Sequence, residues 1–319
     1  MASTPRLAAF AFRRPSLTSS KTWCSIPLKS PQHPPPSPKR PLLTVATLNV
    51  WFDNKMHGSV RFAAILDCLV GLGADVVCLQ EVNSEFLAMM RAHKGVRSKF
   101  GYFGGGDEGA DISPQTWYGC LILFNRDTVA ASDMRVEYSD SPIPREGTNQ
   151  GRHLLYATFS GVKGKPTEGL VGFKVGTSHV ESPTPQHRSQ AERQRQLGEA
   201  KTILSAGGQG AIFCGDTNVS PEDEAAFPAS LDWWREHDLW LRAARNHNIP
   251  TFGVTYPVKE SPKRLDRLFM VDPSRPYEVV KAELFGNERV HVSDARYAGM
   301  VVYMSDHIGV YASQKPSYR

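Results

Sequence analysis

The chain has 319 residues, of which 40% are hydrophobic and 10% aromatic, enough for one large folded domain or two modest ones. It has no apolar run of the about 18 residues that a membrane-spanning helix needs, so no membrane insertion is expected. The formal charge of +5 belongs to the N-terminus, because residues 1–40 hold seven basic and no acidic residues, which leaves 30 basic against 32 acidic residues, or −2, for the remainder. This excludes a broad positive field for nucleic acid in the folded part, where local clusters or a metal ion would have to make that contact.

Residues 1–41 are rich in Ser, Arg and Pro and cannot build a core. They lack the long apolar segment of a secretory signal, and their basic, hydroxylated, acid-free composition is typical of a transit peptide for a plastid or mitochondrion. The alternative is a disordered tail on a nuclear or cytoplasmic protein, in which Pro38-Lys39-Arg40-Pro41 is a weak nuclear signal. An odd number of cysteines without CxxC spacing favours a reducing compartment over a disulfide framework.

The folded sequence begins with a strand, a helix and a second strand, predicted at Leu42–Trp51, Val60–Leu72 and Asp75–Leu79. Ser84 is expected to cap a short helix that runs through Met90. The glycine-rich segment Gly101–Gly109 is expected to be a loop, since it lacks the order of a phosphate-binding fingerprint. Strand, helix and strand in this order favour a layered α/β domain.

The rest of the chain is mostly strands, which predicts two stacked sheets with helices outside. One long helix is expected at Gln186–Ser205, with its charges on a solvated face. The tryptophans between Asp232 and Trp240 are interpreted as packing residues rather than base-stacking ones. The remaining strands are expected at residues 119–124, 135–138, 153–159, 170–178 and 264–269, and a last one follows residue 305.

The segment Ala211–Asn218 carries the strongest chemical signal. A short buried strand leads to Gly215, which frees the backbone, and then to Asp216 and Asn218. If the chain stays extended, residues two apart share a side, so a carboxylate and a carboxamide would face one spot. That pair suits a water molecule that must be deprotonated and aimed, because Asp accepts a proton and Asn orients. The alternative is an ordinary turn with Asx capping.

Other polar residues also stand at the ends of apolar strands. Each has a structural alternative: Glu81 as a helix cap, His179 as a core imidazole, and Asp266 as a partner of Arg264 or Arg267. Carboxylates and amides suit a hard cation such as Mg²⁺ or Mn²⁺, not structural zinc. The residues in question are Asn49, Glu81, His179, Asp216, Asn218, Asp266, Asp306 and His307.

Six motifs follow one another along the chain: Thr47–Trp51, Leu79–Val82, Thr177–Ser182, Gly215–Asn218, Arg264–Arg267 and Ser305–His307. In this order they resemble the endonuclease/exonuclease/phosphatase superfamily, and within it the chain looks most like the tyrosyl-DNA phosphodiesterase 2 subfamily. The resemblance covers roughly residues 43–314. It implies a tail at 1–41 and one catalytic domain at 42–316 with a four-layer αββα sandwich of two mostly antiparallel sheets flanked by helices.

The resemblance also implies the role of each residue. Glu81 would be the chief metal ligand, with Asn49 and Asp306 beside it, while Asp216 would activate the attacking water and Asn218 would position it. Charge that builds on the phosphoryl oxygens is neutralised by a metal ion and an imidazolium, which agrees with these assignments.

The remaining assignments concern the phosphate. His307 would hold the phosphate oxygens with Asp266 fixing its ring, His179 would stabilise the transition state, and Ser182 and Asn218 would contact the phosphate.

The implied function is a Mg²⁺-dependent phosphodiesterase that releases tyrosine or a peptide from DNA 5′ ends, acting as a monomer in DNA repair. Another phosphoesterase of the superfamily is the alternative: an RNA 3′-exonuclease, an abasic-site endonuclease, or an inositol or sphingolipid phosphoesterase. A non-catalytic scaffold is a third. Three departures bear on the substrate: Ser220 replaces an expected arginine, Asn49 is followed by Trp51-Phe52 without the usual acid and glycine, and Tyr256 follows Thr255 where a Tyr-Trp pair is expected.

Overall fold

The computed structural model describes residues 10–11, 24–25, 42–104, 118–138, 152–183, 190–207, 210–227, 233–243, 249–256, 261–271, 277–291 and 300–316. The tail expected at residues 1–41 therefore lies outside the described residues, except for the two-residue strands β1 (Phe10–Ala11) and β2 (Cys24–Ser25). No helix in these described ranges has both the length and the apolar character to cross a bilayer.

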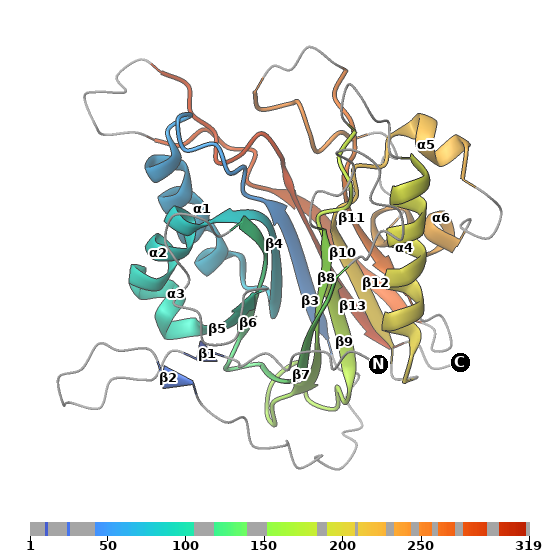
Figure 1. Ribbon diagram of the computed structural model, residues 1–319. Coiled ribbons are helices and arrows are strands. Elements are labelled where there is room, and N and C mark those ends of the chain that lie inside the picture. The colour runs from blue at the N-terminus through green and yellow to red at the C-terminus, as the bar shows by residue number, and fades with distance from the viewer. Residues whose placement is uncertain are drawn as a thin grey trace, which may run out of the picture.

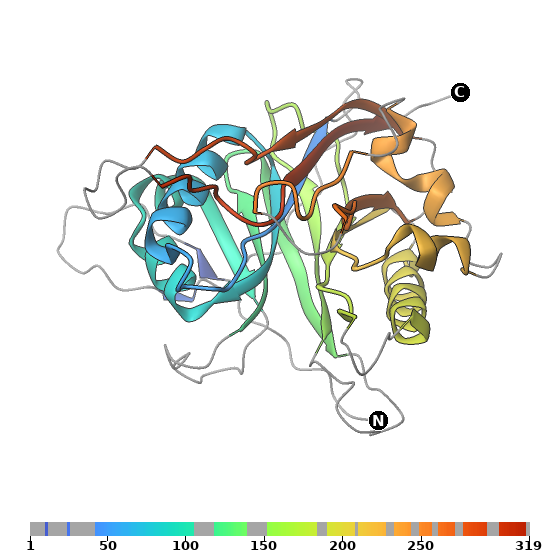
Figure 2. The same ribbon diagram turned by 90° about the horizontal axis from the view of Figure 1, so that it is seen from above.

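Two sheets form the centre of the molecule, and helices cover their outer faces (Figure 1). Seven helices are described: α1 (Gly58–Leu72), α2 (Ser84–Ala92), α3 (Lys94–Lys99), α4 (Gln190–Ser205), α5 (Pro221–Ala225), α6 (Trp233–His237) and α7 (Leu239–Arg242). Figure 2 shows the same layers from above, with α1–α3 on one side of the sheets and α4 on the other. The expected four-layer αββα sandwich is confirmed.

The larger sheet has the strand order β12-β13-β3-β4-β6-β5-β1-β2, and the smaller has the order β11-β10-β9-β8-β7. Every pairing is antiparallel except β3 with β4 and β9 with β10. The strands of the larger sheet are β3 (Leu43–Asn49), β4 (Val76–Asn83), β5 (Phe100–Gly104), β6 (Tyr118–Asn125), β12 (Tyr277–Phe285) and β13 (Gly309–Pro316), besides β1 and β2. Those of the smaller are β7 (Val129–Tyr138), β8 (His153–Gly161), β9 (Phe173–Thr177), β10 (Ala211–Asp216) and β11 (Asp266–Met270).

The alternation of side chains along each strand divides the core into layers. On β3, Val45 packs between the sheets with Ile212 of β10, whereas Leu48 faces the α1–α3 layer. A third cluster joins the smaller sheet to its helices and contains Leu197 of α4 and Trp234 of α6. Trp234 is buried, which agrees with the interpretation of the tryptophans as packing residues.

The structure corrects three local predictions. Asn83, not Ser84, caps α2, because its side-chain oxygen accepts a hydrogen bond from the Phe86 N–H at 2.9 Å. The glycine-rich segment does not begin as a loop: Phe100–Gly104 forms β5, whose apolar side chains are buried against β6. Strand β12 and helix α3 have no counterpart in the sequence prediction. Residues 105–109 of the expected loop lie outside the described part of the chain.

Buried hydrogen bonds of one amide side chain join the two sheets near the C-terminal ends of β3, β4 and β9. Gln80 of β4 is fully buried, and its Nε2 donates to Thr47 Oγ1 on β3 at 3.0 Å and to Thr177 Oγ1 on β9 at 2.9 Å. Since Thr177 belongs to the smaller sheet, this amide bridges the interface. The buried amide thereby fixes the relative position of the strand ends that follow.

Candidate active site

Strand direction alone gathers the predicted residues at one edge. Because β3 and β4 are parallel, their C-terminal ends share an edge, as do those of β9 and β10. The antiparallel strands β11 and β13 begin at this edge, since β11 pairs with β10 and β13 with β3. The site side chains lie at these ends and in the loops that follow or precede them: Asn49, Glu81, His179, Ser182, Asp216, Asn218, Asp266, Asp306 and His307.

His307 lies between two carboxylates. Asp216 and Asp266 are register partners at the ends of β10 and β11, and the imidazole of His307 contacts both. Its Nδ1 is 2.7 Å from Asp266 Oδ2, and its Nε2 is 3.6 Å from Asp216 Oδ2. Thr251 Oγ1 accepts the N–H of Asp266 at 3.0 Å, and the Phe252 ring packs on the imidazole with centroids 4.9 Å apart. The ring of His307 is therefore fixed on several sides.

The two histidines of the site have opposite charge preferences. Burial acts to lower the pKa of His307, but Asp266, Asp216 and Asp306 outweigh it, so the pKa is raised well above its usual value. The pKa of His179 is lowered well below its usual value by burial and by the positive charges of Arg152 and His307. Near neutral pH the site thus holds one imidazolium and one neutral imidazole.

His179 joins the two halves of the predicted site. Its Nε2 is 3.5 Å from Asp216 Oδ2, and its Nδ1 is 3.9 Å from Glu81 Oε1. Ser182 Oγ lies 3.4 Å from His179 Nε2 and accepts a hydrogen bond from Asn218 Nδ2 at 3.2 Å. The predicted base, water-positioning amide, phosphate-contacting hydroxyl and chief metal ligand are therefore one contiguous group.

The Asp216–Asn218 segment is a turn, not extended chain. Asn218 has a left-handed φ of 50°, and its N–H donates to Asp216 Oδ1 at 3.0 Å, as in an Asx turn. The expectation that extended geometry aligns the two side chains is therefore wrong, although both reach the His179 group. Gly215 is required before the turn, because a Cβ there would lie 2.2 Å from the Ser178 carbonyl oxygen.

Glu81 is aimed by a bulge in β4. The β4–β6 register shifts between Leu79 and Val82, and Glu81 takes a left-handed φ of 56°, which is rare for such a side chain. Its Oε2 accepts the Phe52 N–H at 3.1 Å, so it does not cap α2. Unusual backbone of this kind concentrates at functional sites.

Several carboxylates lie close together around Glu81 and Asp306. Burial together with Glu81 and Asp216 raises the pKa of Asp306 to about 6, although His307 and Arg61 oppose the shift. The described residues contain no group of three or more His, Cys, Asp or Glu side chains arranged around a metal position. Two carboxylates and the Asn49 amide are nevertheless a donor set that Mg²⁺ uses, because this ion keeps several waters. The oxygen donors and the excess of carboxylates fit a hard divalent cation.

Arg61 is the principal supporting residue that the sequence prediction missed. It is 0% exposed, and its guanidinium donates to five carbonyl oxygens. Four belong to the loop after Asn49, and the fifth, Met304 O, lies two residues before Asp306. The contacts are to Met56 at 2.6 Å, Asp53 at 2.8 Å, Met304 and Trp51 at 3.0 Å, and Val50 at 3.1 Å. Arg61 thereby joins the loops that carry Asn49, Phe52 and Asp306.

The arginines near Asp266 have other partners. Arg264 Nη1 bonds Asp238 Oδ2 at 2.7 Å, and buried Arg267 pairs with Glu224 and donates to Val219 O at 3.2 Å. His307, rather than either arginine, is thus the ion-pair partner of Asp266. Burial lowers the pKa of Arg267 to about 10.

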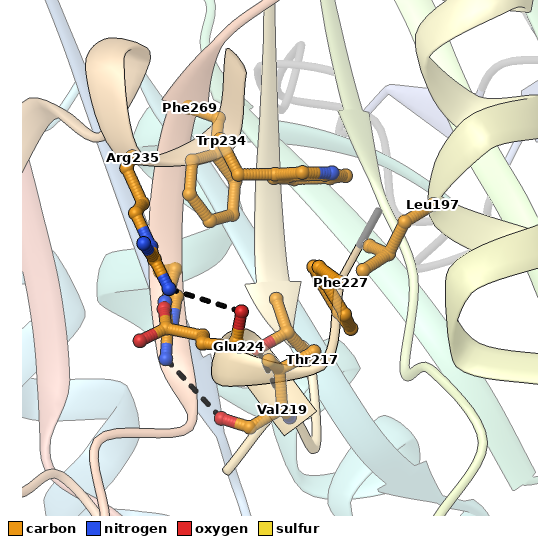
Figure 3. Close-up of a pocket in the computed structure, with 9 residues that line it drawn as sticks. Leu197, Thr217, Val219, Glu224, Phe227, Trp234, Arg235 and Phe269 are labelled. Atoms are coloured by element: carbon orange, nitrogen blue, oxygen red, sulfur yellow. Dashed lines mark hydrogen bonds and ion pairs between the residues drawn. The ribbon is translucent and has the colours of Figure 1, made fainter. Parts of the chain in front are cut away.

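A cavity adjoins the back of the Asp216–Asn218 turn (Figure 3). Apolar Trp234, Phe227 and Leu197 line it together with the ion pair of Arg267 and Glu224. Thr217 and Val219, which flank Asn218, also line it, and Thr217 Oγ1 donates to Leu265 O at 2.7 Å. The turn is therefore held from behind by the Leu265 carbonyl, just before β11, and by Arg267.

Helix α4 supports the loop that carries Ser182. Arg193 is buried, donates to Glu181 O at 3.3 Å and pairs with Asp223 of α5 at 2.9 Å, while Gln196 Oε1 accepts the Glu181 N–H at 2.8 Å. The interpretation of this helix as a solvated charged face is therefore wrong at Arg193, because its charge points toward the loop.

The departures noted in the sequence have structural explanations. Ser220 caps α5 through a reciprocal capping box with Asp223. Tyr256 packs on Trp51 with centroids 4.8 Å apart, and its hydroxyl donates to Tyr303 O at 3.1 Å. These residues therefore support the loops around the site.

The fold and this edge define a class of enzyme. A sheet sandwich that presents carboxylates, amides and imidazoles together is suited to hydrolysis of phosphoester bonds. The model of the Endonuclease/Exonuclease/phosphatase family matches residues 46–307, and the chain belongs to that family. Its members are hydrolases of phosphoester bonds that generally use divalent metal ions.

Several solved structures share the fold. Humanized D. rerio TDP2 with 14 mutations is 23% identical, with a TM-score of 0.64 over 86% of this chain and 98% of that one. D. rerio TDP2 complexed with single-strand DNA product is 22% identical, with a TM-score of 0.65 over the same shares. Bacteroides thetaiotaomicron mannosyl-6-phosphatase is 19% identical, with a TM-score of 0.61 over 85% of this chain and 99% of that one. No match was found among curated proteins.

Proposed function

We propose that this chain is a Mg²⁺-dependent phosphodiesterase that hydrolyses 5′-phosphotyrosyl links to DNA and so repairs protein–DNA adducts. The observation that carries the proposal is the group formed by Asp266, His307 and Asp216, joined through His179 to Glu81. The likeness of the fold to TDP2 structures, one of them with a single-strand DNA product, supports this choice among phosphoesterases.

The side chains of this group have separate roles in the proposed reaction. Asp216 accepts the proton of the attacking water, and Asn218, held by Ser182 and the Val180 carbonyl, orients that water. The His307 imidazolium, oriented by Asp266, donates to the phosphoryl oxygens as their charge increases.

Glu81, Asp306 and Asn49 would hold the cation. When bound, Mg²⁺ supplies positive charge that stabilises the phosphoryl oxygens in the transition state. It also compensates the carboxylates, whose mutual repulsion contributes to the raised pKa of Asp306. The tyrosyl leaving group has a pKa of about 10, well below that of a sugar hydroxyl, so departure needs little help from a general acid.

The test is a metal-dependent turnover panel. The substrates are a 5′-phosphotyrosyl oligonucleotide, an abasic duplex, poly(A), an inositol phosphate and mannose 6-phosphate. Turnover of the first above all others is the expected result. Preferential turnover of another member would replace the substrate assignment and leave the family chemistry intact.

Two variants test the assigned roles. Glu81→Gln and Asp216→Asn should each lower turnover by orders of magnitude while the fold is retained. Glu278→Gln is the matched control, because that carboxylate lies on β12 and is about half exposed in a pair with Lys315. Near-normal rates in either site variant would show that the assignment is wrong.

We also propose that the chain is imported into a plastid or mitochondrion and is then cleaved before about residue 41. The basis is the acid-free, basic composition of that segment. Fractionation and N-terminal sequencing of the endogenous protein test this, and full-length protein confined to the nucleus would refute import.

A further inference from the structure

Two exposed aromatic side chains lie beside the site. Among the described residues, seven large hydrophobic side chains are exposed: Phe52, Met56, Tyr118, Val254, Val280, Met300 and Val301. The rings of Phe52 and Tyr118 contact each other. The Phe52 N–H donates to Glu81, and the Tyr118 hydroxyl lies next to His179. Adjacent exposed apolar side chains of this kind indicate a binding surface.

Phe52 is the better defined of the two, because its backbone is fixed by hydrogen bonds while the residue is 51% exposed. Its N–H donates to Glu81 Oε2 at 3.1 Å, and its carbonyl accepts from Asn83 Nδ2 at 2.8 Å. The ring meets the Tyr118 ring edge to face, with centroids 5.6 Å apart and planes at 88°. A rigid, uncovered aromatic surface therefore lies next to the chief carboxylate of the site.

This surface lies across His179 from the assigned base. Nε2 of His179 faces Asp216, whereas Nδ1 faces Glu81 and is 3.5 Å from the Tyr118 hydroxyl. In phosphoryl transfer the attacking and leaving oxygens are roughly in line with the phosphorus. If water attacks from the Asp216 side, the leaving group departs on the side of Glu81 and Phe52.

We infer that the Phe52 ring, held edge-on by Tyr118, forms the subsite for the aromatic ring of the leaving group. The inference rests on the proposed function, which places the attacking water at Asp216. The Phe52 side chain has no hydrogen-bonding group, so it selects for a flat apolar face.

Binding of non-hydrolysable ligands tests this without turnover. Two labelled oligonucleotides carry a 5′-benzylphosphonate or a 5′-butylphosphonate cap, and affinity is measured by fluorescence anisotropy in Mg²⁺. The wild type should prefer the benzyl cap about tenfold, which corresponds to about 1.4 kcal/mol. Phe52→Ala should abolish the preference, and Phe52→Trp should retain it. Val280→Ala, which truncates an equally exposed side chain remote from the site loops, should leave it unchanged.

Each other outcome has a defined meaning. Equal affinity of the wild type for both caps, or no binding of either, overturns the inference. A Phe52→Ala variant that weakens both caps equally also overturns it, because Phe52 then contacts the nucleotide. An aryl preference that depends on Phe52, in a protein that does not cleave 5′-phosphotyrosyl DNA, supports the subsite and refutes the proposed function.

Discussion

Replacement of Arg61 by alanine is the sharpest test of how the site is built. The side chain is fully buried, and all five of its N–H groups are used on carbonyl oxygens. Alanine leaves those carbonyls without their donor and removes the cation that packs on Trp51 at 4.6 Å. Loss of Arg61 should therefore affect both stability and the geometry of the loops after β3 and before β13.

The expected magnitude follows from the contacts. A hydrogen bond to a charged group stabilises by about 1.5–3 kcal/mol, but five on one side chain are not additive. Burial also opposes the charge, as the lowered pKa of Arg61 indicates. Breaking a buried charged network by removing one partner costs about 3–5 kcal/mol, so we expect about 4 kcal/mol less unfolding free energy. Displacement of the loops next to Asn49 and Asp306 by about 1 Å should lower kcat about 100-fold.

Urea unfolding and turnover measure the two effects separately. Arg135→Ala is the matched control, because Arg135 is a partly exposed arginine paired with Asp133 and should change stability by less than about 1 kcal/mol. Guanidinium ion, well below denaturing concentrations, should restore part of the activity of Arg61→Ala by occupying the vacated space. Unchanged turnover in Arg61→Ala, or a stability loss no larger than in the control, would refute this account of the loops.

Three further predictions follow from the site and the core. Asp266→Asn should lower kcat about 10³-fold with little change in KM, because His307 loses the carboxylate that orients it and favours its charged form. A rise in KM as large as the fall in kcat would contradict this. Chelation with EDTA should abolish turnover and excess Mg²⁺ should restore it, so full activity in EDTA would exclude metal dependence. Burial raises the pKa of Cys120 to about 12, so iodoacetamide at pH 8 should modify it only after unfolding, as mass spectrometry would report.

Much of the architecture was accessible from the sequence because the signals were local. Buried strands such as Ala211–Asp216 are continuous apolar runs, and the helix at Gly58–Leu72 has apolar residues at helical spacing. Strand ends then mark where polar groups gather, without knowledge of the pairing. Strand β12 was missed because six of its nine positions are exposed or half-buried in no regular alternation, so its pattern is weak.

The supporting residues were not accessible in the same way. Arg61 is a charged residue on the buried face of α1, a signal that the sequence prediction did not use, and its partners are carbonyl oxygens, which carry no sequence signal. The bulge that aims Glu81 depends on pairing with β6, and the turn at Asn218 depends on contacts with β11 and Arg267. The candidate site residues could thus be named from the sequence, whereas the contacts that hold them in place could be identified only from the folded structure.

The Gln80 amide, which hydrogen-bonds Thr47 on one sheet and Thr177 on the other, has a consequence for unfolding. Glu81 and Asp216 belong to different sheets, so neither sheet alone contains a complete set of reacting groups. The rate of hydrolysis therefore reports whether the two sheets are packed against each other. In a denaturant titration, catalysis should disappear as the halves part, even where each sheet keeps its own backbone hydrogen bonds.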